Sequence, residues 1–220
     1  MKKFTFFSGL ILITFFATTN VKSQWSKIGP PGGLPVWNVA IDTAGGRHNV
    51  FAVNDKGLYR STDYGNSWLP NMNIAPGSVP GGLLVKSNYV FYEGFQNDFG
   101  LYRSSDHGDT WSYIPIWNLP VSSLTANVNY IFAAVSTYWG VYHSTDNGNS
   151  WLVQNPWGNS DCSAVTASGT TIFAGTDINS LYVSLNNGVN WTETSLINQS
   201  IINLTSSPGN VFAGTLYNGL

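Results

Sequence analysis

The chain of 220 residues is poor in charge, and this shortage excludes one class of protein. Charged residues make up 9% of the sequence, against a usual share of about 25%. The formal net charge is −2 and no basic run occurs. A nucleic-acid partner is therefore excluded, and solubility has to come from Asn, Ser, Thr and Gly.

Cysteine and histidine are equally scarce. Cys162 is the only cysteine, so no intramolecular disulfide can form. A lone cysteine is most often a small apolar core residue, and the alternative is a reactive thiol. With only His48, His107 and His143 beside it, the chain has too few ligands for a dedicated zinc site. We expect neither a metal nor a cofactor.

Long apolar runs are also missing beyond the N-terminus. Lys2 and Lys3 precede the apolar stretch Phe4–Ala17, and Ser23 fits the small-residue pattern of a cleavage site. This order predicts a secretory signal peptide over residues 1–23. No later run approaches the ~20 apolar residues of a membrane helix. We expect a secreted, periplasmic or cell-surface protein.

What the chain has in abundance is repetition. The phrase "GLYRSTDYGNSW" at 57–68 returns as "GLYRSSDHGDTW" at 100–111 and as "GVYHSTDNGNSW" at 140–151. A second marker is a phenylalanine in segments such as "NVFAV", with successive spacings of 40, 41, 41 and 39 residues. These phenylalanines are Phe51, Phe91, Phe132, Phe173 and Phe212. Two markers with one period establish an internal repeat.

Each repeat has the pattern of four short strands. Runs rich in β-branched and aromatic residues alternate with Gly, Asn and Asp, and no segment keeps a helical period. A four-stranded unit of this length has to stack on its neighbours, which predicts an all-β fold, a β-propeller of antiparallel blades. A solenoid of β-arches is the less favoured alternative. The expected blades span residues 35–73, 79–116, 120–156 and 161–197, with a partial blade at 200–220.

The repeated phrase predicts a tight turn between two strands. Its glycine supplies the positive φ angle of the turn, its aspartate accepts hydrogen bonds from turn N–H groups, and its tryptophan buries a large ring. We call the four instances box turns 1 to 4. They consist of Ser61, Asp63, Gly65, Ser67 and Trp68; Ser104, Asp106, Gly108, Thr110 and Trp111; Ser144, Asp146, Gly148, Ser150 and Trp151; and Ser184, Asn186, Gly188, Asn190 and Trp191.

These turns resemble Asp boxes, also called bacterial neuraminidase repeats. The resemblance covers nearly all of residues 25–220 and extends to sialidases, xyloglucan-active endoglucanases, sortilin-type receptors and photosystem II assembly factors. It implies a structural hairpin at the rim opposite the ligand face. If the turn donors are buried, replacing Asp106 with Ala should cost roughly 1–3 kcal/mol of stability.

The two ends of the chain resemble parts of blades. The segment 24–30, "QWSKIGP", is similar to the fourth strand "TWSYIPI", and the chain stops inside the motif that follows Phe212. We therefore expect a fragment of about four and a half blades. In the longer protein, further C-terminal blades would follow and segment 24–30 would close the ring. Open sheet edges of this kind favour aggregation.

Sialidase activity is disfavoured. The resemblance implies three arginines that converge from different blades, together with a Tyr–Glu pair. Here Arg60 and Arg103 occupy the same repeat position, where His143 and Val183 stand in later repeats, and Arg47 is the remaining arginine.

Hydrolysis of a neutral glycan would need two carboxylates. Those expected on or beside ligand-face loops are Asp55, Asp98, Asp161 and Asp177. Each is more often a turn-former, and their spacing selects no pair. The same face is expected to carry aromatic side chains, as sugar or peptide platforms or as inter-blade packing. These are Phe95, Phe99, Trp117, Tyr138, Trp139 and Trp157.

Two functions follow from this sequence. The first is an exported binding scaffold for glycan or protein ligands, and the alternative is a glycoside hydrolase acting on a neutral polysaccharide. A photosystem assembly role is weaker, because the basic surface that it implies is absent.

Overall fold

The computed structural model describes residues 29–30, 33, 35–70, 82–95, 99–114, 120–136, 140–158, 160–178, 180–207 and 209–216, and only the backbone of Phe95 and Phe99. Several sequence predictions lie outside these residues: the signal peptide, most of segment 24–30, Asp98, Trp117, Tyr138 and Trp139. None of the helices in the described part is long and apolar enough to cross a membrane.

The described chain forms four four-stranded antiparallel sheets and one two-stranded sheet, which we call blades 1 to 4 and the half-blade. Blade 1 contains β1 (Val36–Asp42), β2 (Asn49–Asn54), β3 (Gly57–Ser61) and β4 (Leu69–Pro70), with a 3-10 turn at Ala44–Gly46. Blade 2 contains β5 (Leu83–Lys86), β6 (Tyr89–Phe95), β7 (Phe99–Ser104) and β8 (Ser112–Ile114). Blade 3 contains β9 (Val121–Ala126), β10 (Ile131–Val135), β11 (Gly140–Ser144) and β12 (Leu152–Gln154). Blade 4 contains β13 (Cys162–Ser168), β14 (Thr171–Thr176), β15 (Ser180–Ser184) and β16 (Thr192–Ile197). The half-blade contains β17 (Ile201–Ser207) and β18 (Asn210–Thr215).

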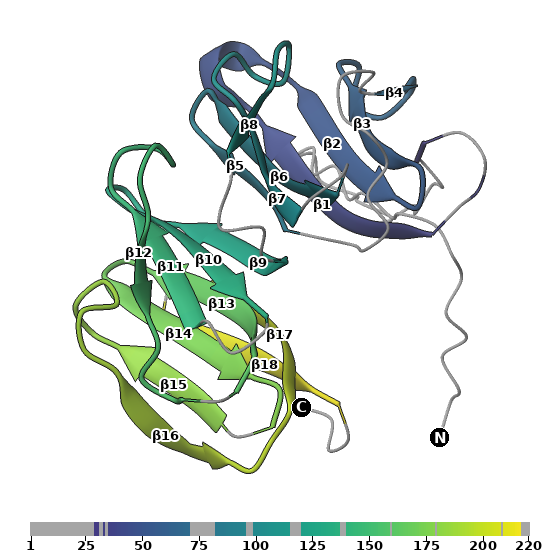
Figure 1. Cartoon of the computed structure of the whole chain (residues 1–220). Helices are drawn as coiled ribbons and strands as arrows, with labels where there is room; N and C mark the ends of the chain where they lie inside the picture. Colours follow the sequence, from purple (N-terminus) through teal and green to yellow (C-terminus); the bar gives the residue numbers. More distant parts are fainter. Residues whose placement is uncertain are drawn as a thin grey trace, which may run out of the picture.

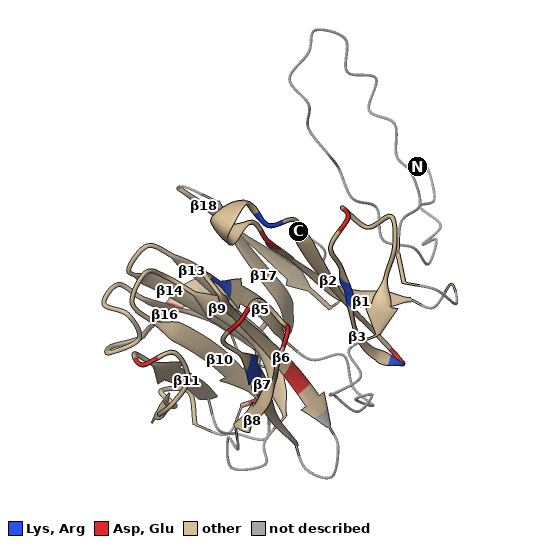
Figure 2. Ribbon diagram, turned by 90° about the horizontal axis from the view of Figure 1, so that it is seen from above, with Lys and Arg blue, Asp and Glu red and all other residues tan. Residues whose placement is uncertain are grey.

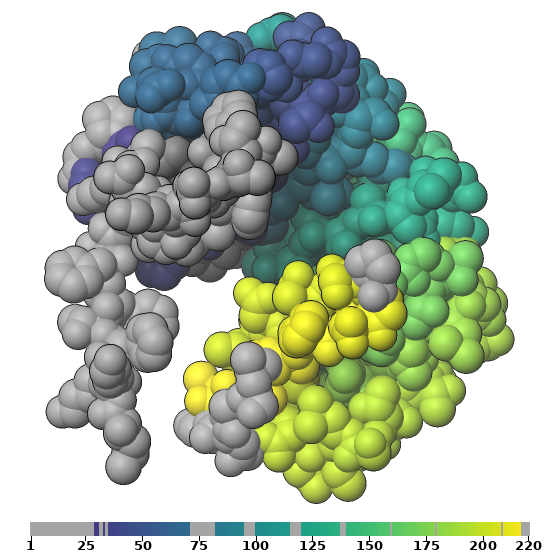
Figure 3. Space-filling view, turned by 180° about the vertical axis from the view of Figure 1, so that it is seen from behind, coloured from purple at the N-terminus to yellow at the C-terminus, as the bar shows by residue number. Residues whose placement is uncertain are grey.

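The sheets follow one another around an arc (Figure 1). Strands within each sheet are hydrogen-bonded in chain order, and the first strands of successive sheets pack side by side, β1 on β5, β5 on β9, β9 on β13 and β13 on β17. The colours of the space-filling view run round this arc from purple and blue in blade 1 to yellow in the half-blade (Figure 3). The fold is a β-propeller, as the repeat predicted.

The core lies between neighbouring blades. The second strands β2 and β10 are buried at every residue, whereas the outer strand β4 is exposed. The marker residues Phe51, Phe91 and Phe132 are 0% exposed. Burying such rings is the main favourable term that holds one blade against the next.

Candidate functional site

The four box turns close through one set of hydrogen bonds. In box turn 1 the Ser61 hydroxyl oxygen accepts the Gly65 N–H at 2.8 Å, and the hydroxyl donates to Asp63 Oδ1 at 2.8 Å. Asp63 also accepts the N–H and the hydroxyl of Ser67, at 2.8 and 2.6 Å. The same Ser–Gly bond measures 2.7–2.8 Å in the other three turns. The repeated phrase is thus one repeated piece of geometry.

The buried polar side chain of each turn is that of the serine. Ser104 is 0% exposed and accepts the buried Gly108 N–H at 2.7 Å, while Asp106 is only half-buried. Replacing Asp106 with Ala is expected to be costly if the donors of the turn are buried. The buried donor here is the Gly108 N–H, and it bonds to Ser104. We expect Ser104→Ala to be the more damaging of the two changes.

The carboxylates of the box turns have low pKa values. Hydrogen bonds from Ser67 and Ser61 lower the pKa of Asp63 to about 2. Burial opposes ionisation of Asp106, yet the bonds from Thr110 and Ser104 outweigh it and lower its pKa to about 2. Asp146 follows the same rule, with bonds from its own turn lowering its pKa to about 2. These three carboxylates are engaged in hydrogen bonds within their own turns.

The combined change D63N, D106N and D146N should make the stability of the protein depend less on pH under acid conditions. Each folded pKa of about 2 lies below the ordinary 3.8. The ionised forms therefore stabilise the fold above about pH 4, and this contribution is lost as the pH falls towards about 2. Asn186 already makes the corresponding bonds in box turn 4, at 2.9 Å from Ser184 Oγ and from the Asn190 N–H. Urea midpoints measured across this pH range test the prediction, and an unchanged acid slope in the triple variant would contradict it.

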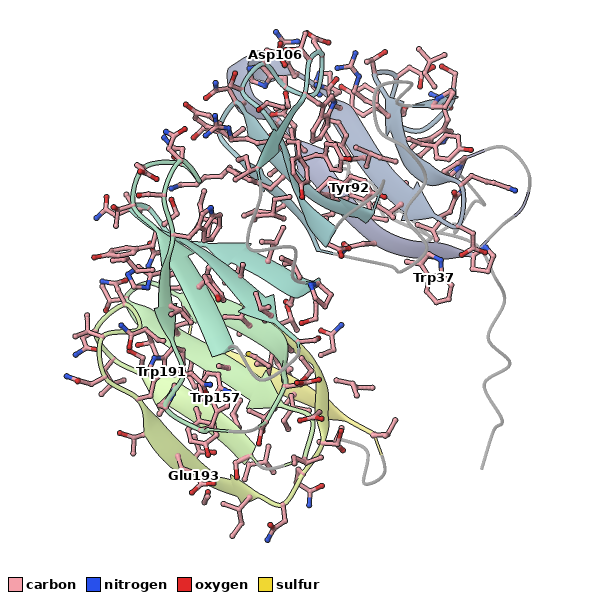
Figure 4. All side chains as sticks on the ribbon, in the orientation of Figure 1. Trp37, Tyr92, Asp106, Trp157, Trp191 and Glu193 are labelled. Atoms are coloured by element: carbon pink, nitrogen blue, oxygen red, sulfur yellow. The ribbon has the colours of Figure 1, made fainter. Side chains whose placement is uncertain are left out.

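Box turns also join successive blades. A Cβ atom on Gly108 would lie 2.6 Å from Phe51, and one on Gly148 would lie 2.9 Å from Phe91. Each turn glycine therefore packs on the marker phenylalanine of the preceding blade, with positive φ angles of 89° and 83°. Figure 4 labels Asp106 at this rim.

The arginines belong to the same joints. Arg60 donates to the carbonyl oxygen of His107 at 3.2 Å and to Asp109 Oδ1 at 2.6 Å. Arg103 makes the equivalent bonds to box turn 3, at 2.9 and 2.7 Å. The buried carboxylate of Asp42 adds a contact to His107 Nδ1 at 2.8 Å. Figure 2 shows that the few charged positions are scattered over the ribbon.

The opposite end of the sheets carries a ring of bulges. In four of the five sheets, one extra residue interrupts the pairing of the first strand with the second: Trp37 in β1, Ser122 in β9, Ser163 in β13 and Ile202 in β17. A bulge re-aims a side chain at the end of a sheet. The register places these bulges near the turn between second and third strands, because Val36 pairs with Asn54, and thus away from the box turns.

The bulge ring borders a cavity of about 250 Å³ between the first strands. The described residues that line it include Asn38, Ser122, Ser163 and Ile202, and none of them carries a charged side chain. Ser122 Oγ donates to the carbonyl oxygen of Cys162 at 2.7 Å, across to the next blade. The cavity therefore presents hydroxyl and amide groups without a net charge, and we call it the channel mouth.

An oriented tryptophan precedes one of the residues that line this cavity. Trp37, which precedes the lining residue Asn38, is 51% exposed, and its indole Nε1–H donates to Asp55 Oδ1 at 2.7 Å. Figure 4 shows Trp37 at the end of the upper blades opposite Asp106. Asp55, a sequence candidate for catalysis, is thus the residue that holds the ring. Sequence reasoning missed Trp37, because a bulge residue does not follow strand alternation.

Two of the predicted carboxylates lie side by side at the mouth end of blade 4. The Asp161 N–H donates to Asp177 Oδ1 at 3.1 Å, and the Asp177 N–H donates to the Asp161 carbonyl oxygen at 3.1 Å. Residues sixteen apart in sequence meet here because β13 and β14 are antiparallel neighbours.

The predicted aromatic Trp157 lies in the core. It is 7% exposed, with its ring centroid 5.0 Å from Tyr182 and 5.6 Å from Trp191. Figure 4 shows Trp157 and Trp191 together within blade 4. Inter-blade packing is the role that the sequence favoured for these aromatic side chains.

Glu93 is a buried carboxyl that the sequence did not single out. It is 2% exposed, and its Oε2 has no hydrogen-bond partner. Burial raises its pKa to about 8, opposed by a hydrogen bond from the Val121 backbone. In the same register the other blades have Val53, Ala134 and Gly175, so Glu93 interrupts an otherwise apolar joint.

Metal-binding and thiol chemistry find little support in the described residues. They contain no group of three or more His, Cys, Asp or Glu side chains that could hold a metal ion. Cys162 is fully buried, and burial raises the pKa of its thiol. The thiolate is the reactive form, so Cys162 is an inert core residue.

Comparisons with known proteins support the fold. No protein-family model matches the chain, and no curated protein matches it. An ancestral GH74 enzyme aligns with a TM-score of 0.68 at 19% identity over 88% of this chain and 31% of that enzyme. The extracellular domain of BT4673 from B. thetaiotaomicron gives 0.66 at 16% identity over 95% and 29%. YCF48 bound to D1 peptide gives 0.63 at 18% identity over 86% and 62%. The chain thus spans less than two thirds of each of these proteins, and the likeness is one of β-propeller fold.

Proposed function

We propose that this chain is part of an exported β-propeller scaffold that binds an uncharged glycan or peptide at the channel mouth. The observation that carries the proposal is the oriented, half-exposed Trp37, next in sequence to Asn38, which belongs to the uncharged lining of a cavity of about 250 Å³. An aromatic face next to hydroxyl and amide groups suits a ligand that is apolar on one side and hydrogen-bonding on the other.

The fold neighbours support a ligand on this kind of scaffold. One of them is YCF48 with a bound peptide, another is an extracellular domain, and a third is a GH74 enzyme. The resemblance of the box turns to Asp boxes adds that the ligand face lies opposite these turns. Trp37 and the bulge ring occupy that opposite end.

Trp37→Ala should weaken ligand binding about tenfold, which corresponds to about 1.4 kcal/mol, the upper part of what an aromatic contact contributes. Titration calorimetry with xyloglucan oligosaccharides and, in parallel, an uncharged peptide would measure it. Leu69→Ala is the matched control, because Leu69 is 69% exposed on the outer strand β4. Equal affinities of both variants and the wild type would refute a site at Trp37.

Glycoside hydrolysis is the second candidate, and the adjacency of Asp161 and Asp177 is the observation that favours it. Both side chains lie at the mouth end of blade 4, but Asp177 Oδ1 already accepts the Asp161 backbone N–H at 3.1 Å. Incubation of the same oligosaccharides with wild type and with Asp177→Asn separates the two functions. New reducing ends that disappear in the variant would establish hydrolysis, whereas binding without cleavage supports the scaffold.

A further inference from the structure

Box turn 4, whose Trp191 is labelled in Figure 4, exposes different side chains from the other box turns. The residue after its serine is Leu185, where box turns 1 to 3 have Thr62, Ser105 and Thr145. The residue after its glycine is Val189, where the others have Asn66, Asp109 and Asn149. Leu185 is 73% exposed and Val189 is 59% exposed. Two positions that are polar in every other box turn are therefore apolar and open to solvent here.

The closure of the turn does not require these two apolar residues. The Val189 N–H donates to the Asn186 carbonyl oxygen at 3.3 Å, and the corresponding bonds of box turns 1 to 3 measure 3.3–3.4 Å. The bond from the Gly188 N–H to Ser184 also has the length found in the other turns. The backbone is thus the same with polar or with apolar side chains, so the reason for Leu185 and Val189 lies outside the turn.

A third apolar side chain comes from the neighbouring blade. Val128 lies in the turn between β9 and β10 and is 89% exposed. The adjacent Asn127 donates through Nδ2 to Asn187 Oδ1 at 2.7 Å, so this turn rests on box turn 4. In the part of the chain that the structure describes, Val128 and Leu185 are the two most exposed large apolar side chains. We call Val128, Leu185 and Val189 the rim patch.

The joint beneath the rim patch also lacks the polar contact of the earlier joints. Arg103 donates to Asn149 Oδ1 at 2.7 Å between blades 2 and 3, and an ion pair occupies the same place between blades 1 and 2. At these two positions the joint of blades 3 and 4 has His143 and Val189. His143 Nδ1 has no hydrogen-bond partner, and burial lowers the pKa of the imidazole, which is therefore neutral at pH 7. Both members of the contact are replaced, and the rim patch has no charge beside it.

The chemistry of the rim patch selects one class of partner. Its side chains are aliphatic, so they offer neither the aromatic face nor the hydrogen-bonding groups that suit a glycan. No Lys or Arg occurs after Arg103, and basic side chains are what attract an anionic membrane surface or a nucleic acid. Three side chains fall far short of the about 800 Å² that each partner buries in a stable protein–protein interface, so a dimer of the chain would gain too little. A short apolar segment of another protein fits a patch of this size.

We infer that the rim patch is a docking surface for a short, uncharged apolar segment of a partner protein. Apolar side chains of the segment pack on Leu185, Val189 and Val128, and a charge on the segment would be desolvated there without compensation. A group of exposed apolar side chains within a polar rim is typical of such a contact. Because the box turns lie away from the channel mouth, the partner and the ligand bind at opposite ends of the sheets. The inference does not depend on the proposed function.

Chemical-shift mapping with a defined peptide tests the inference. The probe is a short end-capped peptide of alternating leucine and serine, added to the isotope-labelled chain. We expect it to shift the backbone amide signals of Val128, Leu185 and Val189. The double variant Leu185→Thr with Val189→Asn carries the residues of box turn 3 and should bind the probe about tenfold more weakly. Leu69→Thr is the matched control, because Leu69 is 69% exposed on β4, and it should bind the probe as the wild type does.

The double variant should unfold at the same urea concentration as the wild type, because box turn 3 closes with the same two residues. Equal affinity of the probe for the wild type and the double variant would overturn the inference. Self-association of the wild type in sedimentation that the double variant abolishes would also overturn it, because the occupant would then be a second copy. Binding to phosphatidylcholine vesicles that the double variant loses would replace the protein segment with a membrane.

Discussion

Glu93→Gln is expected to stabilise the protein by on the order of 4 kcal/mol at pH 8 and to have little effect at pH 4. The carboxyl of Glu93 is buried between blades 2 and 3, and burial raises its pKa from 4.5 to about 8. Glutamine keeps the shape and an acceptor for the Val121 N–H, but it does not titrate.

The direction of the pH dependence follows from the number of protons that the folded and unfolded states bind. Between about pH 4.5 and about pH 8 the unfolded chain releases the proton of Glu93 while the folded chain keeps it. The unfolded state then binds fewer protons, so stability falls as the pH rises through this range and levels off above it. Below about pH 4.5 both states are protonated, and wild type and variant converge.

Urea unfolding of both proteins from pH 4 to pH 9 measures the effect. Glu193→Gln is the matched control, because Glu193 is the other glutamate of the chain and is exposed on β16. This variant shows what a change from Glu to Gln does outside the joints between blades. If the Glu93→Gln curve runs parallel to the wild type, then Glu93 ionises freely in the folded protein and its burial has no electrostatic consequence.

The repeat made the architecture predictable. Marker phenylalanines about 40 residues apart and a glycine turn at one fixed place demanded stacked four-stranded units, and the blades follow them. The burial of Glu93 was available from the same pattern, because Glu93 lies two residues after the buried Phe91 and so shares its face.

The candidate site was far less predictable. Trp37 lies in a bulge of β1, which shifts the alternation that sequence patterns depend on. Asp161 and Asp177 meet only through the pairing of β13 with β14, and their spacing in sequence has no motif of its own. The aspartates of the box turns were the conspicuous acids, yet their hydrogen bonds are made within the turns.

Gly108→Ala is expected to destabilise the protein by about 3 kcal/mol through two separate causes. The φ angle of Gly108 is 89°, a conformation that costs an alanine about 1 kcal/mol. In addition, the new Cβ would lie 2.6 Å from Phe51 Cε1 and 2.8 Å from Cζ. Phe51 is 0% exposed and cannot move aside freely, and overpacking of this kind costs about 1–3 kcal/mol.

Gly169→Ala separates the two causes. Gly169 also has a positive φ, 63°, but nothing lies within 4 Å of its Cβ position. Gly169→Ala should therefore have only the energetic cost of the backbone conformation. The difference in stability between the two variants measures how tightly box turn 2 packs on blade 1. A Gly108→Ala protein as stable as Gly169→Ala would mean that the glycine serves the turn alone.

The double variant with Phe51→Leu tests the contact itself. Phe51→Leu shortens the ring that the new methyl group meets, so the two changes together should cost less than the sum of their separate costs. Such a coupling would show that the repeated phrase has a second role besides closing its own hairpin. Its glycine would then fix the spacing between blades, which explains why one turn recurs at each joint from blade 1 to blade 4. If the costs of the two single changes add exactly in the double variant, the turn glycine does not contribute to the packing between blades.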